Sequence, residues 1–143
     1  MQIRQFRHSD RAPCAAIYEL AWQEIFPGNQ RPISVEDFDN ETQGEHILVA
    51  EEGNKVVGFA SVWTQGSFLH HLHVDPRYRR RGAGSALLKS VVRLADSDVS
   101  LKCQIDNVVA LKFYKRRGFE ETGERGSDRL GEWTRLVLRT PAL

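Results

Sequence analysis

Apolar and polar residues alternate along this chain with a period that changes several times, and each change predicts a new secondary-structure element. A period of two, bounded by turn residues, predicts strands at residues 2–6, 46–51, 55–63, 67–74, 100–105, 119–122 and 133–138. A helical period predicts helices that follow Ser9 or Asp10, Ser34, Gly82, and Asp106 or Asn107. Strands and helices are therefore mixed along the chain, as in an α/β domain.

Short signals set the limits and the connections of these elements. Ser34 with Asp37 three positions later has the character of a capping box, and Gly53-Asn54 suits a tight hairpin turn. A helix lies between the strands at 67–74 and 100–105, so these two strands should be parallel. The chain has no repeat, low-complexity tract or linker, so we expect residues 1–143 to form a single α/β domain with a mixed sheet.

The segment from His73 to Leu88 runs from a strand through a basic, glycine-bearing turn into a helix, and it is suited to hold a diphosphate. The start of a helix leaves backbone N–H groups unpaired and carries a partial positive charge, so an anion is stabilised there. Gly82 and Gly84 let phosphate oxygens approach the main chain, and the run 79–81 adds three arginines. A solvated basic turn without a ligand is the open alternative.

Neither of two common phosphate motifs matches this turn. The chain contains no P-loop run of Gly, four residues and Gly-Lys-Ser/Thr. The dinucleotide motif would need a small residue where Leu87 stands.

Two segments carry a resemblance to a known family. Arg79-Arg80-Arg81-Gly82-Ala83-Gly84 matches the Arg/Gln-x-x-Gly-x-Gly/Ala motif of the GCN5-related N-acetyltransferases (GNAT). Downstream, the segment 107–119 resembles the family's later helix, with Asn107 at its start, Tyr114 seven residues on and Gly118-Phe119 at its end. The hairpin at 49–58 is also similar, so the likeness covers nearly the whole chain. It implies the GNAT fold, a mixed, mostly antiparallel twisted sheet whose central parallel strand pair splays apart and is flanked by helices.

The resemblance also implies acetyl-CoA as the acetyl donor and assigns residues to it. The main chain of 72–74 should bind the pantetheine arm, and the amides of the turn should receive the pyrophosphate. The arginines can also reach the 3′-phosphate. Asn107 lies near the pantetheine in family members, although it can equally be a simple helix cap. The cofactor-binding residues expected on these grounds are Leu72, His73, Val74, Arg79, Arg80, Arg81, Gly82, Ala83, Gly84, Ser85 and Asn107.

Tyr114 is the expected general acid, because acyl transfer from a thioester expels a thiolate that needs a proton. The reference pKa of a phenol, about 10, exceeds that of a thiol, about 8.5, so the phenol keeps its proton at neutral pH. Hydrogen bonding to the thiolate is an equally good form of this role. The competing interpretation is a core tyrosine whose hydroxyl bonds a backbone carbonyl.

The general base is less evident from the resemblance. Some relatives use a glutamate five positions before the Asn, but Lys102 stands there, and Ser67 is near the place of the glutamate in histone-acetylating relatives. Amine-acetylating relatives can carry a histidine where this chain has His70, and an imidazole accepts protons near neutral pH. Strand alternation would put His70 on one face of the strand and His71 on the other, so only one of them can face the acceptor site. We favour His70 for this position. The alternative is that both are half-buried structural residues.

The acceptor should be recognised by the first helices and the last hairpin. We expect substrate contacts from Trp22, Glu24, Phe26 and His71, although simple packing is the alternative for the aromatic residues. Residues 123–131 read as a mobile, mixed-charge loop that could close on the substrate or remain solvated.

Composition excludes several classes of protein. The net charge of +1, from 20 basic and 19 acidic residues, provides no global field for nucleic acid or an anionic membrane. Cys14 and Cys103 are too few for a disulfide framework and should be buried, which suggests a reducing compartment. No Cys/His/Asp spacing fits a structural zinc site, so no metal is expected. Without an apolar run of ~18 residues or a leader sequence, a cytoplasmic protein is expected.

Two functions remain in competition at this point. The first is an acetyl-CoA-dependent N-acetyltransferase in which a primary amine, of a small molecule or a protein, attacks the thioester directly in a ternary complex. The second is a non-catalytic module that binds acyl-CoA and regulates a partner. Binding of nucleic acid through the basic runs is disfavoured because they lack interleaved aromatic residues. The acceptor amine is not identified by the sequence, and a homodimer is left open.

Overall fold

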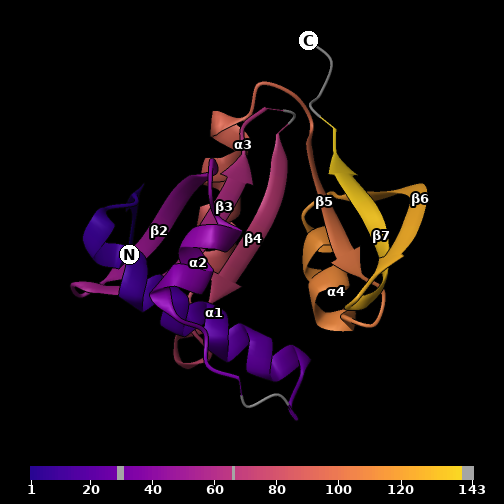
Figure 1. The fold of residues 1–143 in the computed structure, drawn as a ribbon. Helices are drawn as coiled ribbons and strands as arrows, with labels where there is room; N and C mark the ends of the chain where they lie inside the picture. Colours follow the sequence, from indigo (N-terminus) through magenta and orange to yellow (C-terminus); the bar gives the residue numbers. More distant parts are fainter. Residues whose placement is uncertain (29–30, 66, 140–143) are drawn as a thin grey trace.

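In the computed structural model, which describes residues 1–28, 31–65 and 67–139, seven strands form one sheet in the order β1-β2-β3-β4-β5-β7-β6 (Figure 1). The strands are β1 (Gln2–Gln5), β2 (His46–Glu52), β3 (Lys55–Trp63), β4 (Phe68–Val74), β5 (Val99–Gln104), β6 (Glu120–Asp128) and β7 (Gly131–Leu138). The helices are α1 (Arg11–Ile25), α2 (Val35–Glu41), α3 (Ala83–Leu94) and α4 (Val108–Arg116), with 3-10 turns η1 (His8–Asp10) and η2 (Pro76–Tyr78).

Neighbouring strands are antiparallel except β4 and β5, which are parallel because α3 connects them. The paired residues of β4 and β5 are Phe68 and Ser100, at the start of both strands. Beyond this point the two strands diverge toward their carboxyl ends (Figure 1). The predicted mixed, mostly antiparallel sheet with a central splayed parallel pair is confirmed.

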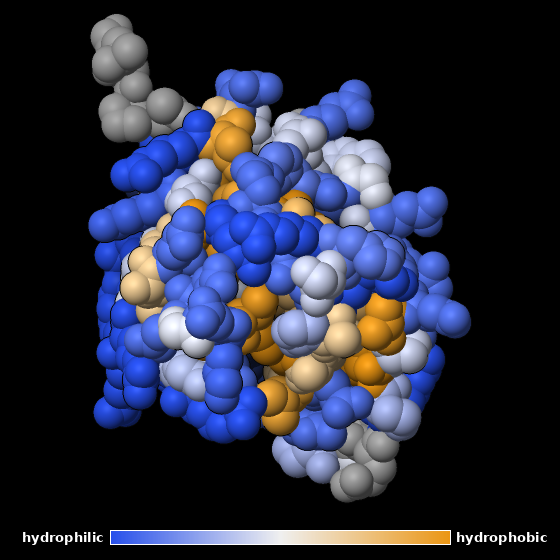
Figure 2. All heavy atoms as spheres, turned by 90° about the vertical axis from the view of Figure 1, so that its left-hand side faces the viewer, coloured by the Kyte–Doolittle hydropathy of each residue, from blue (hydrophilic) through white to orange (hydrophobic). Residues whose placement is uncertain are grey.

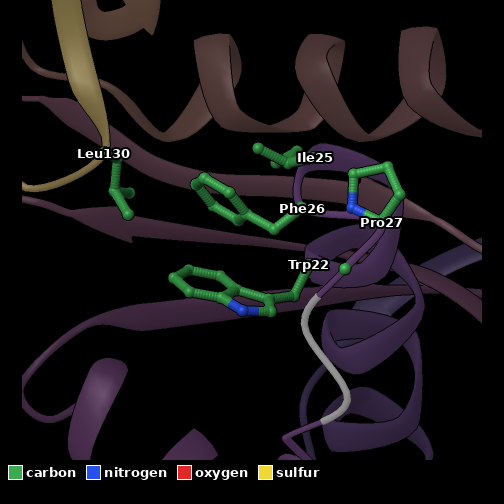
Figure 3. Close-up of a pocket in the computed structure, with 6 residues that line it drawn as sticks. Trp22, Ile25, Phe26, Pro27 and Leu130 are labelled. Carbon is green, nitrogen blue, oxygen red and sulfur yellow. The ribbon is translucent and has the colours of Figure 1, made fainter.

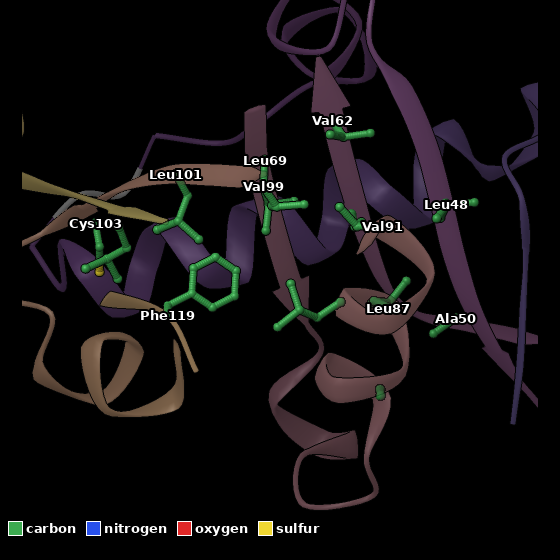
Figure 4. Packing of buried hydrophobic residues seen from close by; sticks show 14 of the residues in the cluster. Leu48, Ala50, Val62, Leu69, Leu87, Val91, Val99, Leu101, Cys103 and Phe119 are labelled. Atoms are coloured by element: carbon green, nitrogen blue, oxygen red, sulfur yellow. The ribbon is translucent and has the colours of Figure 1, made fainter. Parts of the chain in front are cut away.

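Both faces of the sheet are covered around β2, and this strand shows how the sequence achieves this. Its residues 47–50 are all buried, and successive side chains enter opposite cores. Leu48 and Ala50 pack in the core that includes Leu87 and Val91 of α3 (Figure 4). The side chains on the other face pack with α1 and α2, in a cluster formed by Cys14, Ala15, Ile17, Phe38, Ile47, Val49 and Phe59.

The helix starts illustrate one confirmed and one corrected expectation. Ser34 and Asp37 form the predicted capping box, since each side chain accepts a hydrogen bond from the other's backbone N–H at 3.0 Å. Asp10, in contrast, does not cap α1. Its carboxylate instead accepts hydrogen bonds from the Arg4 guanidinium at 2.8 and 2.9 Å, because β1 places this cation beside it.

The predicted mobile loop at 123–131 is wrong for most of its length. β6 continues to Asp128, and its last residues pair with β7 from Arg125 opposite Thr134 to Asp128 opposite Gly131. β6 is an edge strand with nearly all its side chains exposed, so it has no apolar alternation to reveal it in the sequence. Backbone pairing alone extends this hairpin, and the register shifts between Glu121 and Arg125.

Hydrophilic side chains cover most of the molecular face on the side of β2, and apolar side chains gather in a smaller area low on this face (Figure 2). Within the described residues, no helix combines the length and apolar character needed to cross a membrane. Cys14 and Cys103 are free thiols, and both are buried as predicted.

Candidate active site

The end of β4 is fixed by Asp75, which is buried and is held from both sides. Its N–H donates to the Val57 carbonyl of β3 at 2.8 Å, and its carboxylate accepts from the Arg77 N–H at 2.9 Å. The Arg77 guanidinium also bonds this carboxylate, which lowers the pKa of Asp75. These contacts fix the direction in which the chain leaves the sheet and enters the turn at 79–82.

The turn at 79–82 has the backbone conformation of an anion site. Arg80 and Gly82 adopt left-handed φ values of 65° and 85°. The first helical hydrogen bond of α3 runs from the Ala86 N–H to the Gly82 carbonyl at 3.0 Å, so the N–H groups of residues 83–85 have no partner within the helix. Unpaired N–H groups at a helix start, next to left-handed residues, form a concavity for phosphate oxygens.

The three arginines of the turn do not contribute equally to its positive charge. Arg79 forms an ion pair with Glu24 of α1, with one N–O distance of 2.8 Å. Arg81 pairs with Glu52 at 3.2 Å and lies 5.3 Å from the centre of the Tyr78 ring. Arg80 has no ion pair among the described residues and is exposed. The turn therefore holds one free guanidinium and two that are already paired with carboxylates.

Gly84 and Ser85 fix α3 against α4. A Cβ on Gly84 would lie 3.3 Å from the Phe113 ring, so glycine allows this close approach. The Ser85 hydroxyl accepts a hydrogen bond from Arg117 Nε at 2.9 Å, and the Arg117 guanidinium stacks 3.7 Å from the centre of the Phe113 ring. The two segments that carry the sequence motifs are thereby brought into contact.

The main chain of β4 is polarised between its two edges. Because the Asp75 N–H bonds β3, the alternation of an antiparallel ladder points the N–H and C=O groups of His73 toward β3 as well. Those of Leu72 and Val74 point to the opposite side, from which β5 has diverged. Among the three β4 residues expected to bind a ligand through their main chain, Leu72 and Val74 thus have free backbone groups.

Asn107 and Tyr114 lie at opposite ends of α4. The Asn107 side-chain oxygen accepts from the Ala110 N–H at 3.2 Å, so Asn107 is a helix cap, and its amide NH₂ is not needed for that role. Tyr114 lies between the rings of Phe113 and Phe119, with centroid distances of 5.2 and 5.3 Å. Burial, with a smaller contribution from Cys103, raises the pKa of Tyr114.

The Tyr114 hydroxyl makes no hydrogen bond within the described part of the chain. Its oxygen is not among the fully buried side-chain atoms that lack a partner. The competing interpretation, a hydroxyl fixed on a backbone carbonyl, is therefore not observed. The phenol proton is retained at neutral pH, so the hydroxyl can donate a hydrogen bond to a ligand.

A β-bulge corrects the expected arrangement of the histidines. His71 pairs with Ser61 of β3, but Leu69 pairs with the next residue, Val62, so His70 has no register partner. The extra residue breaks the alternation, and the rings of His70 and His71 lie side by side with centroids 3.9 Å apart. The prediction that these two side chains occupy opposite faces is wrong, because a one-residue bulge cannot be detected in the hydrophobic pattern.

The environments of the histidines differ. His71 is buried against Tyr18 and Phe59, and burial lowers its pKa to about 2. His73 lies against the same two rings, and burial lowers its pKa to about 4. Only His70 is exposed among the three.

His70 has a partner that sequence reasoning missed. Its Nδ1 lies 2.7 Å from the Glu45 carboxylate, and the Ser61 hydroxyl donates to the other Glu45 oxygen at 2.5 Å. The Glu45 side chain is 7% exposed, so this carboxylate is held in a low-dielectric position. Glu45 precedes β2 by one residue and is 25 positions from His70, so no local pattern could reveal the pair.

The residues expected to bind the acceptor divide into two groups. The rings of Trp22 and Phe26 are in tilted contact, with centroids 4.9 Å apart. With Ile25, Pro27 and Gly28 they line an open pocket of about 530 Å³, which Leu130 of the β6–β7 turn faces (Figure 3). Glu24 points away from this pocket and forms its ion pair with Arg79.

Lys102 stands at the position where some relatives have a glutamate. It lies 4.4 Å from the centre of the Trp133 ring and is exposed.

Comparisons with known proteins agree with this geometry. A profile of the acetyltransferase (GNAT) family matches residues 14–119. An uncharacterized N-acetyltransferase of Methanocaldococcus jannaschii is 33% identical over 106 residues, which cover 65% of this chain and 45% of that protein. N-alpha-acetyltransferase RimI of Mycobacterium tuberculosis is 33% identical over 87 residues, which cover 56% of this chain and 55% of that protein. The chain thus spans about half the length of these curated relatives.

Solved structures share the fold at low sequence identity. Ribosomal-protein-alanine N-acetyltransferase from Brucella melitensis has a TM-score of 0.77 at 23% identity, over 96% of this chain and 98% of that one. PaiA N-acetyltransferase from Thermoplasma acidophilum, in complex with coenzyme A, has a TM-score of 0.74 at 19% identity, over 94% and 96% of the two chains. Since the matched residues include β4, the turn at 79–82, α3 and α4, this chain belongs to the acetyltransferase (GNAT) family.

Proposed function

We propose that this chain transfers the acetyl group of acetyl-CoA to a primary amine. The observation that carries the proposal is the combination of free main-chain groups at one place. The N–H groups of residues 83–85 are unpaired at the start of α3, and the strand that leads to them offers Leu72 and Val74 where β5 diverges. One feature accepts a pyrophosphate, and the other accepts the amides of a pantetheine arm.

The donor is assigned to residues of three elements. Leu72 and Val74 would bond the pantetheine arm through their backbone, and the turn from Arg80 to Ser85 would receive the pyrophosphate. Arg80, the arginine without an ion pair among the described residues, is the best placed to reach a further phosphate. The side-chain NH₂ of Asn107 remains free to bond the arm.

Tyr114 is assigned to the leaving group. When the amine nitrogen bonds the acetyl carbon, the carbon–sulfur bond breaks and the sulfur becomes a thiolate. The raised pKa of Tyr114 keeps its hydroxyl protonated, but it also makes complete proton transfer to the sulfur unfavourable. Its role is therefore mainly a hydrogen bond that stabilises the developing thiolate, with the proton following as the product leaves.

His70 is assigned to the amine. A primary ammonium ion must lose a proton before its nitrogen can attack, and the exposed ring of His70 can accept it directly or through water. Glu45 orients the ring through the contact at 2.7 Å, as a buried carboxylate beside an imidazole does. Most of the acceleration would come from holding both substrates at attack distance.

The pocket beside Trp22 and Phe26 supports an acceptor with an apolar portion. Its lining side chains are aromatic or aliphatic, and none of the side chains that line it is charged. A primary amine that carries an apolar group would bury that group here, and the open side of the pocket would admit either a small molecule or a chain terminus.

The test combines binding with turnover. A thermal shift with acetyl-CoA should stabilise the protein by about 2.7 kcal/mol at one hundred times the Kd, and NAD should have no effect. Free thiol should then be released from acetyl-CoA when a panel of amines and peptide N-termini is added. Tyr114→Phe, which removes a single oxygen atom, should lower kcat about a hundredfold while the Kd for acetyl-CoA stays the same.

These outcomes separate the competing interpretations. Stabilisation by NAD alone would show that the turn binds a different ligand. Binding of acetyl-CoA without thiol release for any amine would favour the non-catalytic acyl-CoA module. An unchanged kcat in Tyr114→Phe would remove this residue from the mechanism.

A further inference from the structure

The bulge in β4 gathers side chains that a regular strand would separate. His70 and His71 are adjacent in sequence, yet their rings lie on the same side of the sheet, 3.9 Å apart between centroids. This side also faces α2, whose last residue is Glu41. Two imidazoles and one carboxylate therefore meet between the bulge and the end of a helix, although the chain separates Glu41 from the histidines by about thirty residues.

The distances within this cluster are close to those of a metal site. The nearest carboxylate oxygen of Glu41 lies 3.8 Å from His71 Nε2. One donor atom each from Glu41, His70 and His71 lie within 4.8 Å of one another. The Glu41 and His70 side chains are each 37% exposed, so an ion can reach both, and Glu41 can rotate toward ligand distance while His71 stays fixed.

His71 Nε2 is an unexplained polar atom. It is buried and has no hydrogen-bond partner among the described residues. A buried ring nitrogen without a partner is costly and calls for an explanation.

We propose that Glu41, His70 and His71 bind a divalent transition-metal ion, with Zn²⁺ as the best match to the donor set. Two imidazole nitrogens and a carboxylate oxygen are ligands that Zn²⁺ accepts in a tetrahedral site, with water in the fourth position. An ion there would also give His71 Nε2 the partner that it lacks. The ligand spacing departs from every structural zinc pattern, which is why the sequence predicted no metal.

Glu45 completes the site from outside the ligand set. With the His70 Nδ1 proton donated to the Glu45 carboxylate, the ring presents Nε2 to the ion. Carboxylates that accept from the second nitrogen of a ligating histidine orient the ring and increase its basicity. The hydrogen bond from Ser61 holds Glu45 in this position.

An ion at this place has a consequence for turnover that rests on the proposed function. If His70 is the base, a bound ion takes the lone pair that would accept the amine proton. Zn²⁺ would then inhibit acetyl transfer, and a chelator would restore it.

The experiment measures metal binding directly on the whole chain. Titration calorimetry with Zn²⁺ should give one site per chain, and Co²⁺ should give the intense visible absorption of a tetrahedral complex. Glu41→Gln and His70→Gln should each weaken Zn²⁺ binding at least tenfold and abolish the absorption. Matched controls are Glu36→Gln, an exposed carboxylate on the same helix, and His8→Gln, an exposed histidine outside the cluster, and both should bind as the unmodified chain does.

Because His71 is buried, His71→Gln is informative only if circular dichroism shows that it folds, and the proposal does not depend on it. Absence of Zn²⁺ binding, or equal loss in the control variants, overturns the metal site. Tight binding that leaves acetyl transfer unchanged supports the site but removes His70 from its proposed role as base. A protein that binds Zn²⁺ but shows no acetyl transfer would overturn the proposed function alone.

Discussion

Gly82→Ala tests the proposal that the turn at 79–82 binds a phosphate. Glycine is needed at this position for its backbone conformation and not because space is short. The residue has φ of +85°, and a Cβ built on it would meet no atom within 4 Å. Alanine would therefore be strained by its backbone alone. The N–H groups of Gly82 and of residues 83–85 are the donors of the predicted pyrophosphate site. If alanine at position 82 moves its backbone out of the left-handed region, these donors are also misaligned.

The magnitude follows from the cost of the left-handed conformation, which is about 1–2 kcal/mol for an L-residue with a side chain. A chain of 143 residues has an unfolding entropy of about 0.3 kcal/mol/K, so this loss corresponds to about 3–7 °C in Tm. Misalignment of one N–H that bonds a charged phosphate oxygen costs a further 1.5–3 kcal/mol of binding, about tenfold or more in the Kd for acetyl-CoA.

The assay compares Gly82→Ala with Gly123→Ala by thermal unfolding and by calorimetry with acetyl-CoA. Gly123 lies in β6 at the far edge of the sheet, and it matches Gly82 in having φ of +90° and open space around the missing Cβ. Both variants should lose similar stability, but only Gly82→Ala should bind acetyl-CoA more weakly. Equal affinity in the two variants would refute the assignment of the turn to the pyrophosphate.

Two further predictions concern the ion pair of Asp10 and the acceptor pocket. Asp10→Asn should lower the free energy of unfolding by about 2 kcal/mol at pH 7, because Arg4 loses one of its two carboxylate partners and keeps only Glu51. Arg4 lowers the pKa of Asp10 in the folded state, so this stabilisation is complete above the unfolded-state pKa of about 3.9 and is lost as the pH falls through the folded value. Urea unfolding at pH 7 and pH 3 should show a smaller difference between variant and parent at pH 3, and a difference independent of pH would contradict the linkage. Phe26→Ala should raise the KM for the acceptor amine about tenfold, because apolar contact in the pocket is lost, and should leave the KM for acetyl-CoA unchanged. A raised KM for acetyl-CoA with an unchanged KM for the amine would show that the pocket binds the donor.

Much of the fold could be predicted because it depends on neighbours in the chain. The capping box of Ser34 and Asp37, the strands with a buried face and the parallel relation of β4 and β5 follow from local spacing and from the connecting helix. The extension of β6 could not be predicted, since an exposed edge strand needs only a partner for its backbone and carries no apolar alternation. The turn at 79–82 was found from its residues, but the pairing of Arg79 with Glu24 was not.

The sequence by itself determined the order of the elements, the family and the position of the turn for which we propose phosphate binding. Each of these depends on short segments in which the informative residues are close together in the chain. Only the tertiary structure decided how the side chains of the candidate site combine. The bulge at His70 reverses the face of one ring, the partner of His70 is Glu45, and Glu41 joins them from the end of α2. These contacts join residues about thirty positions apart or depend on a single inserted residue in a ladder, and neither feature leaves a periodic signal in the chain.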